Sequence, residues 1–566
     1  MTPSTRTRPA LFWILLISFL LIWLYALGAR TLVPTDEGRY AEIAREMLAT
    51  GDWITIRLNG IKYFEKPPLQ SWMNAATFAL FGLGDWQARL WTGLCGLLGI
   101  GAVVFTGRRV FGPTVGLNAG LVLGSSVLWA ALGHINTLDM GLSAMMALAL
   151  CGLLLAQHSG ASARAQRDGM LLCWAGMALA VMSKGLIGIV LPGAVLTLYV
   201  LLARDWPLLK RLHAGKGLAL FFAITAPWFV LVSLRNPEFA RFFFIHEHFE
   251  RFTSKVHHRA GPVYYFLPIL VLGAIPWLGM LGHSLIQAAR GSASGVLHGA
   301  TEIAESTPPC RFRPRLLLLV WSGFIFAFFS VSSSKLPSYI LPIFPALALL
   351  IACSLQQVST RVLRLNAAVL VALGVAGLVA LSRVPALAHE AFERPLYTAY
   401  LPWIGAAALI AVIGGIAAFV LAQRSRQQSI VLTAATGFLL LQALMIGHDP
   451  LGRYAAGIDY VAAINAATTP QTHLYTVNHY EQALPFYLRR TSTLVGQADE
   501  MAFGLQQEPA LWLPDIEVFV QRWQTAAPAI AVMAPDTYTQ LKNRQIPMRV
   551  IASDPRRVIA TNQLRP

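Results

Sequence analysis

Long apolar runs recur along the first 447 residues and are separated by short polar connections. A helix that crosses a membrane needs roughly 20 consecutive, mostly apolar residues. Runs of this kind begin near Leu11, Ala88, Thr114, Leu138, Met170, Leu186, Leu218, Tyr264, Leu316, Tyr339, Asn366, Leu401 and Ile430. The pattern predicts an all-α polytopic membrane protein with about 13 transmembrane helices over residues 1–447. An odd number of helices would place the two chain ends on opposite sides of the membrane.

The pattern changes after Gly447, where apolar runs shorten to strand length. Strand-like runs alternate with helical stretches such as YEQALPFYLRR and PDIEVFVQRW; the runs are HLYTV, STLVG, AIAVMA and RVIAS. This alternation predicts a small C-terminal α/β domain over residues 448–566. No glycine-rich phosphate loop opens its helices, so the sequence gives this domain no nucleotide site.

Composition supports the membrane assignment. Of the 566 residues, 56% are hydrophobic and 13% are charged, and the mean hydropathy is +0.56. A soluble protein carries about a quarter charged residues, so this chain has too few to cover a soluble surface. The net charge of +17 would suggest nucleic acid on a soluble protein, but here Lys and Arg gather in short connections such as 108–109. That distribution predicts contact with anionic membrane lipids and excludes nucleic acid as a partner.

The basic connections also predict an orientation, because Lys and Arg accumulate on the cytoplasmic side. With Arg6 and Arg8 inside, the other inner connections are 108–109, 164–167, 204–216, 290–315, 361–364 and 424–426. The facing connections mix acids with bases, and two of them, residues 30–88 and 235–262, are far longer than a turn requires. This orientation places both long loops and the C-terminal domain on the outer side of the membrane.

The first long loop contains two further expected elements. The stretch EGRYAEIAREMLATGDW predicts a short amphipathic helix that ends at Gly51. The segment 73–81 is apolar but too short to span, and such segments lie in the plane of the membrane interface.

The same loop carries candidate chemistry close to the membrane. Asp36 and Glu37 follow the first span, and acids beside a bilayer are costly unless they have a partner or a role. An alternative is that Thr35 or Asp36 caps the following helix. Further along, Glu65 and Lys66 are held before two prolines, although a proline-ended loop with solvated charges would look the same.

The remaining outer connections repeat one theme, a polar or charged side chain at the membrane edge. The positions are Asn136, Asp139, Lys184, His246, Glu247, His248, Arg251 and Lys335. One such lysine is usually a helix-end residue that extends its ammonium to water, but several beside acids predict a site for an anionic ligand. His246 and His248 do not share a helix face, and the HExxH motif is absent. A metal site from Glu65 and His246 stays open, because sequence cannot establish that their loops meet.

These residues lie in a set of motifs that resembles a known family. The motifs are PTDEGRYAEIAREM, YFEKPPLQSW, GHINTLDM, MSKGLIG, RFFFIHEHFERF and SSSKLPSYILPIFPAL. Together they resemble the lipid A aminoarabinose transferases (the ArnT family) and, more broadly, protein O-mannosyltransferases and other membrane glycosyltransferases of the GT-C type. The resemblance implies transfer of 4-amino-4-deoxy-L-arabinose from undecaprenyl phosphate to a lipid A phosphate. It also implies a bacterial inner membrane, a site facing the periplasm, and resistance to polymyxin and cationic antimicrobial peptides.

The resemblance assigns roles to particular residues. Asp36 matches the catalytic acidic position, and Glu65 and His246 match a candidate metal site. We expect a divalent ion there, such as zinc, to position the donor and not to be essential for the chemistry. Substrate contacts are expected from Arg39, Tyr40, Tyr63, Lys66, Asp139, Lys184, Arg251 and Lys335. The chain is expected to act as a monomer, and the role of its tail stays open.

Two alternative functions remain. A related transferase could use another lipid-linked sugar or another acceptor, and only an assay separates the two. A transporter of lipid-linked sugars would show internal repeats and charges at the middle of the membrane. The sequence has no evident repeat, and its charges gather at the outer edge of the spans.

Overall fold

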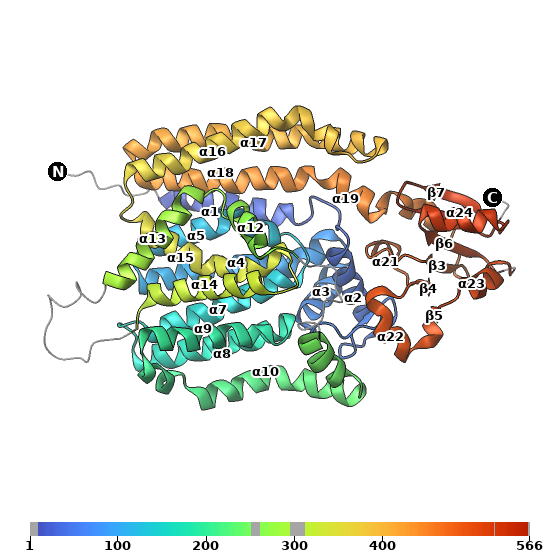
Figure 1. Cartoon of the computed structure of the whole chain (residues 1–566), viewed down its shortest axis with the longest axis horizontal. Coiled ribbons are helices and arrows are strands. Elements are labelled where there is room, and N and C mark those ends of the chain that lie inside the picture. The colour runs from blue at the N-terminus through green and yellow to red at the C-terminus, as the bar shows by residue number, and fades with distance from the viewer. Residues whose placement is uncertain (1–8, 251–260, 295–311, 526, 564–566) are drawn as a thin grey trace.

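A bundle of helices forms most of the molecule, and the α/β domain lies beyond one end of it (Figure 1). The structure, a computed structural model, describes residues 9–250, 261–294, 312–525 and 527–563. Two helices of the first long loop, α2 and α3, lie between the bundle and the α/β domain. The bundle helices are α1 (Pro9–Ala26), α4 (Asp85–Val110), α5 (Pro113–Ser125), α6 (Val127–Leu132), α7 (Leu138–Gln157), α8 (Ala163–Lys184), α9 (Ile187–Ala203), α10 (Ala214–Arg235), α12 (Phe266–Gly273), α13 (Leu278–Ser294), α14 (Pro314–Val331), α15 (Phe344–Leu355), α16 (Thr360–Ala380), α17 (Arg394–Arg424) and α18 (Arg426–Gly447).

The expectation of a multi-pass membrane protein is confirmed, but the number of spans stays a prediction. Within the described ranges, eight helices are long and apolar enough to cross a membrane, or nine if the bent pair α12–α13 is one span. The helices α1 and α9 are apolar but shorter. Each predicted span start lies in a helical segment or at its cap. The run from Tyr264 differs from a straight span, because the chain bends by 114° between α12 and α13, where Pro276 lacks a backbone N–H.

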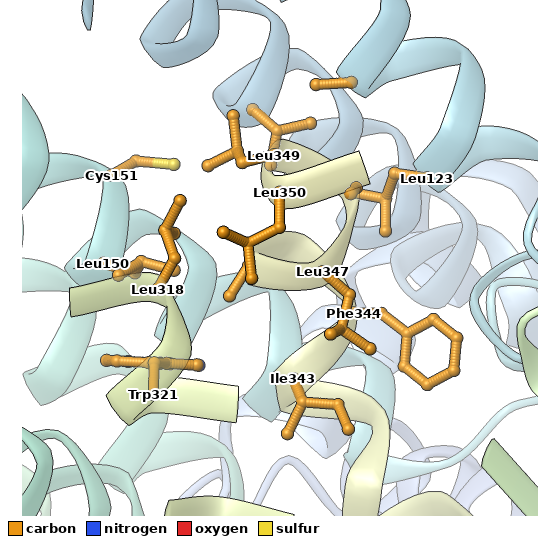
Figure 2. Close-up of a cluster of buried hydrophobic side chains, with 14 of the residues drawn as sticks. Leu123, Leu150, Cys151, Leu318, Trp321, Ile343, Phe344, Leu347, Leu349 and Leu350 are labelled. Carbon is orange, nitrogen blue, oxygen red and sulfur yellow. The ribbon is translucent and has the colours of Figure 1, made fainter. Parts of the chain in front are cut away.

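The core of the bundle surrounds α7 and the segment Pro337–Leu355 that ends in α15, and in the most apolar stretch of each, 89% of the residues are buried. Figure 2 shows Leu150 and Cys151 of α7 and Leu318 and Trp321 of α14 around the leucines of α15. The Trp321 indole N–H also donates to the Pro342 carbonyl at 2.8 Å. Large apolar side chains point outward on peripheral helices instead, as on α1, α10 and α17. An exposed apolar surface of this extent fits contact with lipid.

The first long loop contains the predicted short helix, whereas the placement of segment 73–81 in the plane of the membrane interface stays a prediction. The amphipathic stretch forms α2 (Asp36–Thr50), and Gly51 ends it in the left-handed region with φ of 70°, where a residue without a side chain is favoured. A short hairpin of β1 (Arg57–Leu58) and β2 (Ile61–Lys62) follows, and then α3 (Leu69–Phe81). In the second long loop, residues Arg241–Glu250 form a π-helical segment.

The C-terminal part contains a six-stranded sheet of order β5-β4-β3-β6-β8-β7. The strands β3, β4, β5 and β6 are parallel, whereas β8 pairs antiparallel with β6 and β7. The four predicted strands are present, as β3 (His473–Val477), β4 (Thr493–Val495), β6 (Ala529–Met533) and β7 (Arg549–Ser553). Two short strands were not predicted, β5 (Trp512–Leu513) and β8 (Val558–Thr561). The helices are α19 (Asp449–Ala456), α20 (Val461–Ala466), α21 (Leu484–Leu488), α22 (Ala502–Gln507), α23 (Ile516–Trp523) and α24 (Pro535–Asn543). The division into domains 1–447 and 448–566 stays a prediction, although α18 ends at Gly447.

Candidate functional site

One apolar cluster joins the two long loops and the C-terminal domain. Phe64 of the first loop contacts Phe239 of the second, with ring centroids 5.3 Å apart. Phe242 of the second loop stacks on Phe503 of the C-terminal domain at 4.0 Å. All three parts contribute buried residues to this cluster, which lies apart from the bundle core. The two loops therefore meet, a point that sequence alone left undecided.

Glu37 lies at the centre of a buried ion cluster at the start of α2. Its carboxylate is 2% exposed and pairs with Arg30 at 2.8 Å and with Arg89 at 2.6 Å. The backbone N–H groups of Val33 and Asn136 donate to the same carboxylate, both at 2.9 Å. Burial favours the neutral acid, yet the two guanidinium groups hold the pKa of Glu37 well below its ordinary range. The cluster fixes the first turn of α2 against α4 and the turn before α7.

Asp36, one residue earlier, has a different environment. Its side chain is 42% exposed, and its one ion-pair partner among the described residues is Arg39, at 3.5 Å. The Arg39 side chain is only 8% exposed and also donates to the Tyr63 hydroxyl at 3.4 Å. Thr35 occupies the cap position of α2, but its side chain makes no capping hydrogen bond with the described residues. Asp36 therefore combines exposure with a buried cationic neighbour.

Glu500 of the C-terminal domain reaches the same group of residues and was not predicted from sequence. One carboxylate oxygen lies 3.0 Å from Arg39 Nη2, and the other accepts a 2.6 Å hydrogen bond from the Gln482 side chain. Burial raises the pKa of Glu500, which Arg39 opposes. A signal was available: Gln482 and Glu500 follow the carboxyl ends of neighbouring parallel strands, β3 and β4, where α/β sheets commonly bind ligands.

Tyr40 marks where several predicted residues come together. Its side chain is buried, and burial raises the pKa of its hydroxyl well above the ordinary value. The charges of Asp36, Glu65 and Asp139 raise it further, whereas Arg39 lowers it. These groups come from α2, from the loop before α3 and from α7. Burial likewise raises the pKa of Tyr63, and the negative charge of Glu65 raises it further.

An ion pair between Lys184 and Asp139 joins the neighbouring helix ends. Lys184 is the last residue of α8, and Asp139 lies in the first turn of α7. The Lys184 ammonium also lies 5.0 Å from the centre of the Tyr339 ring, within the range of a cation–π contact. The N-terminal end of α7, the C-terminal end of α8 and the segment leading into α15 thus meet at one ammonium group.

The predicted metal ligands have the right chemistry, but a metal site is not confirmed. The Glu65 carboxylate lies 3.6 Å from Lys66 Nζ, which also donates to the Glu65 carbonyl at 2.9 Å. His246 is exposed, and its ring stacks on Phe242 at 5.1 Å. Across the described ranges, no group of three or more His, Cys, Asp and Glu is arranged to hold a metal ion. A carboxylate and an imidazole suit a divalent ion, so a site with two protein ligands stays a prediction.

The predicted cation Lys335 binds backbone carbonyls at the end of a helix. Lys335 is buried, and its ammonium donates to the carbonyls of Phe329, Ser330 and Ser332 at 3.3, 2.8 and 3.0 Å. It thereby satisfies carbonyls at the C-terminal end of α14, where a positive charge is favourable. Its contact with substrate stays a prediction, and Arg251 lies outside the described residues.

A second buried acidic group lies further along α2, against the C-terminal domain. Glu42 pairs with Arg45 at 2.6 Å, and Glu46 accepts hydrogen bonds from the backbone N–H groups of Asn59 and Gly60. Burial raises the pKa of Glu42 to about 8, although the hydrogen bonds from Arg45 lower it. Burial therefore favours a proton on Glu42, whereas the ion pair with Arg45 favours its charged form.

Comparison with known proteins gives a consistent result. The aminoarabinose transferase C-terminal domain matches residues 460–562, and the dolichyl-phosphate-mannose-protein mannosyltransferase family matches residues 65–231. An undecaprenyl phosphate-alpha-4-amino-4-deoxy-L-arabinose arabinosyl transferase of Aeromonas salmonicida is 32% identical over 413 residues, 70% of this chain and 71% of that protein. The relative from Erwinia tasmaniensis is 31% identical, with 72% of each chain covered.

For other relatives the similarity covers less of the protein. The match spans 64% of the length of the relatives from Edwardsiella ictaluri and Proteus mirabilis. A crystal structure of ArnT from Cupriavidus metallidurans bound to undecaprenyl phosphate is similar throughout, with 42% identity, a TM-score of 0.92 and 99% of both chains covered. Its apo form gives a TM-score of 0.90 at 41% identity.

Proposed function

Because the chain belongs to the aminoarabinose transferase family, we propose that it transfers 4-amino-4-deoxy-L-arabinose from undecaprenyl phosphate to a phosphate of lipid A. The observation that carries the proposal is the arrangement of Asp36, Arg39 and Tyr63 at the end of an apolar bundle, close to the Lys184–Asp139 pair. The sequence motifs that hold these residues are the ones that resemble the family.

The reaction places simple demands on these residues. The bond between the anomeric carbon and the donor phosphate breaks, and an oxygen of the acceptor phosphate bonds to that carbon. The leaving group is undecaprenyl phosphate, which is stable as an anion and needs no general acid. Its growing negative charge does need cations, and Lys66 and Lys184 are well situated for it. Electrostatic stabilisation of this kind is often the largest catalytic contribution.

Asp36 has three compatible roles. A phosphate monoester has a second pKa of about 6 and is largely ionised at neutral pH, so little base is needed. Asp36 would remove a residual proton, orient the acceptor through hydrogen bonds, or stabilise the positive charge that develops on the sugar ring. Its exposed side chain beside the buried Arg39 supports each of the three.

The lipid character of both substrates agrees with the apolar surroundings. A hollow of about 480 Å³ at the end of α14 is lined by Phe324, Ala327, Phe328, Val331, Ser332 and Ser333. Ser332 is also one of the residues whose carbonyls bind Lys335. We propose that part of the polyprenyl chain lies there, with its phosphate toward the cations.

We propose that the site faces the periplasm of a bacterial inner membrane. The basic connections 108–109 and 164–167 lie at the ends of α4 and α8 away from α2, whereas Asp85 and Asp139 lie at the other ends of α4 and α7. A reporter that is active only in the periplasm should be active when fused after Asn562. Signal there from a reporter restricted to the cytoplasm would contradict this orientation and the 13-span prediction.

A divalent ion at Glu65 and His246 would hold the donor phosphate and tie the two loops together. Lys66 and Lys184 already supply positive charge, so the ion is not required for bond cleavage. Metal analysis of protein purified without chelator should find such an ion, and Glu65→Ala with His246→Ala should reduce it. Absence of an ion from the unmodified protein would leave both residues as loop contacts.

Mass spectrometry of lipid A provides the direct test of function. Cells that carry the chain should add aminoarabinose to lipid A, whereas cells that lack it, or that carry Asp36→Asn, should not. Addition of a different sugar would favour the related-transferase alternative. Accumulation of the lipid-linked sugar across the membrane, without transfer, would favour transport.

A further inference from the structure

The C-terminal domain supplies one side chain to the group around Asp36. Glu500 lies 3.0 Å from Arg39 Nη2, whereas Asp36 lies 3.5 Å from Arg39 Nη1. Two carboxylates thus share one guanidinium group, and Glu500 is the closer and the less exposed, at 22% against 42%. Gln482 donates to the other oxygen of Glu500 and fixes its orientation.

Competition for Arg39 affects how available Asp36 is. A guanidinium group binds a single carboxylate most strongly through two parallel hydrogen bonds. If Arg39 had Asp36 as its sole partner, such a pair would hold both Asp36 oxygens and leave neither for substrate. Because Glu500 binds Nη2, only Nη1 is directed to Asp36 and to the Tyr63 hydroxyl. Asp36 then keeps an oxygen free for substrate.

The contact between the two parts of the chain is close enough to fix this geometry. At Gly38, one turn into α2, an added Cβ atom would lie 2.5 Å from Ala483 Cα, so only glycine fits. Ala483 follows Gln482 directly, which places the α2 backbone against the loop after β3. Loss of the Glu500 charge would therefore leave Arg39 in position and change only its partner.

We propose that Glu500 is a positioning residue, which directs Arg39 so that Asp36 remains available, and that the C-terminal domain thereby completes the catalytic site. The proposal rests on the proposed sugar transfer. It assigns to this domain a direct part in turnover, in addition to any part in folding.

The test compares two interdomain ion pairs of similar kind. Glu508, in the same domain, pairs with Arg57 of the first loop at 2.9 Å, and among the described residues its side-chain partners are Arg57 and the Lys62 backbone, not Asp36, Arg39 or Tyr63. Glu500→Gln and Glu508→Gln each remove one such charge. We expect Glu500→Gln to lower kcat about tenfold with the donor KM changed by less than about twofold. Glu508→Gln should stay within about twofold of the unmodified enzyme in kcat.

A double variant then asks whether the effect passes through Arg39. With Arg39→Lys in place, adding Glu500→Gln should change kcat by less than about twofold, since coupled residues are not additive. Glu500→Asp keeps the charge at a shorter reach, and its kcat should fall between those of the unmodified enzyme and Glu500→Gln. Thermal unfolding of each purified variant separates activity from folding.

The outcomes distinguish the two levels of proposal. If the unmodified chain transfers no sugar, the proposed function fails and this inference fails with it. If it transfers sugar and Glu500→Gln matches Glu508→Gln, or keeps its full tenfold effect beside Arg39→Lys, the inference alone is wrong. If Glu500→Gln does not fold, Glu500→Asp is tested in its place. The inference is then wrong if Glu500→Asp has the kcat of the unmodified enzyme and Arg39→Lys lowers kcat equally in both proteins.

Discussion

Asp36 and Glu37 are adjacent acids in the first turn of α2, and their surroundings are opposite. Glu37 is 2% exposed and has two arginines and two backbone N–H donors. Asp36 is 42% exposed and has one described cationic partner, at a longer distance. Successive residues of a helix point about 100° apart, so one faces the bundle and the other faces the loops.

The difference separates a structural charge from a chemical one. A buried carboxylate with all its hydrogen-bonding positions filled has nothing left to offer a substrate, and it holds its neighbours in place. A carboxylate with an open side can exchange protons or bind a substrate, and the surrounding fold must position it. Glu37 thus fixes the first turn of α2, on which Asp36 is held.

The largest expected effect comes from removing the charge of Glu37. Glu37→Gln leaves Arg30 and Arg89 buried without a counter-charge, which typically costs about 3–5 kcal/mol. We expect greatly reduced yield and a lower midpoint of thermal unfolding in detergent. A Glu37→Gln protein as stable as the unmodified chain would show that the ion cluster does not hold α2 in place.

The second effect should appear in turnover and leave folding unchanged. Asp36→Asn keeps the shape of the side chain and removes its charge, and we expect transfer to fall by about 10²-fold. Its thermal unfolding should match that of the unmodified protein, because Asp36 is half exposed. Near-normal transfer by a well-folded Asp36→Asn protein would leave Asp36 only the role of a favourable negative charge in the first turn of α2.

A smaller contrast of the same kind concerns two lysines. Lys184→Ala should raise the donor KM, because a lost charge-assisted contact costs about 1.5–3 kcal/mol. The Lys335 ammonium binds three backbone carbonyls, so Lys335→Ala should mainly lower the unfolding midpoint. Equal losses of donor affinity in both variants would support the prediction that Lys335 also contacts substrate.

A further expected effect is a pH dependence of the stability. The pKa of Glu42 is about 8 in the folded protein against an ordinary 4.5, so between these values the folded state holds a proton that the unfolded state releases. The free energy of unfolding therefore falls as pH rises through this window and is constant above it. Glu42→Gln should flatten that fall, measured as the unfolding midpoint between about pH 5 and pH 8. An unaltered pH dependence would contradict the buried, protonated state of Glu42.

Local patterns in the sequence predicted much of this molecule. Apolar runs located the helices, and Gly51 located the end of α2, because both depend on residues close in the chain. The bend at Pro276 and the short strand β5 were missed, since a bend within an apolar run leaves the hydropathy unchanged and two residues give no pattern.

The site was predicted as a set of residues but not as an arrangement. The sequence identifies polar groups at a membrane edge, among them Asp36, Lys184 and Lys335. Only the packing of the fold decides which of these groups meet. Glu500 was missed because it contacts Arg39 across more than 400 residues of chain. Pairing over such separations depends on the fold, which single-sequence patterns do not contain.

The close contact of α2 with the loop after β3 has a consequence for biosynthesis. The Leu32 backbone N–H, four residues before α2, donates to the Tyr487 hydroxyl, 455 residues later in the chain. A ribosome adding about 5–20 residues per second needs about 20–90 s to cover that distance. During this time the first loop is already exposed, while the part that completes it has not been made. Nascent chains stalled before Tyr480 should accordingly transfer no sugar, because the loop after β3 would not yet contact α2.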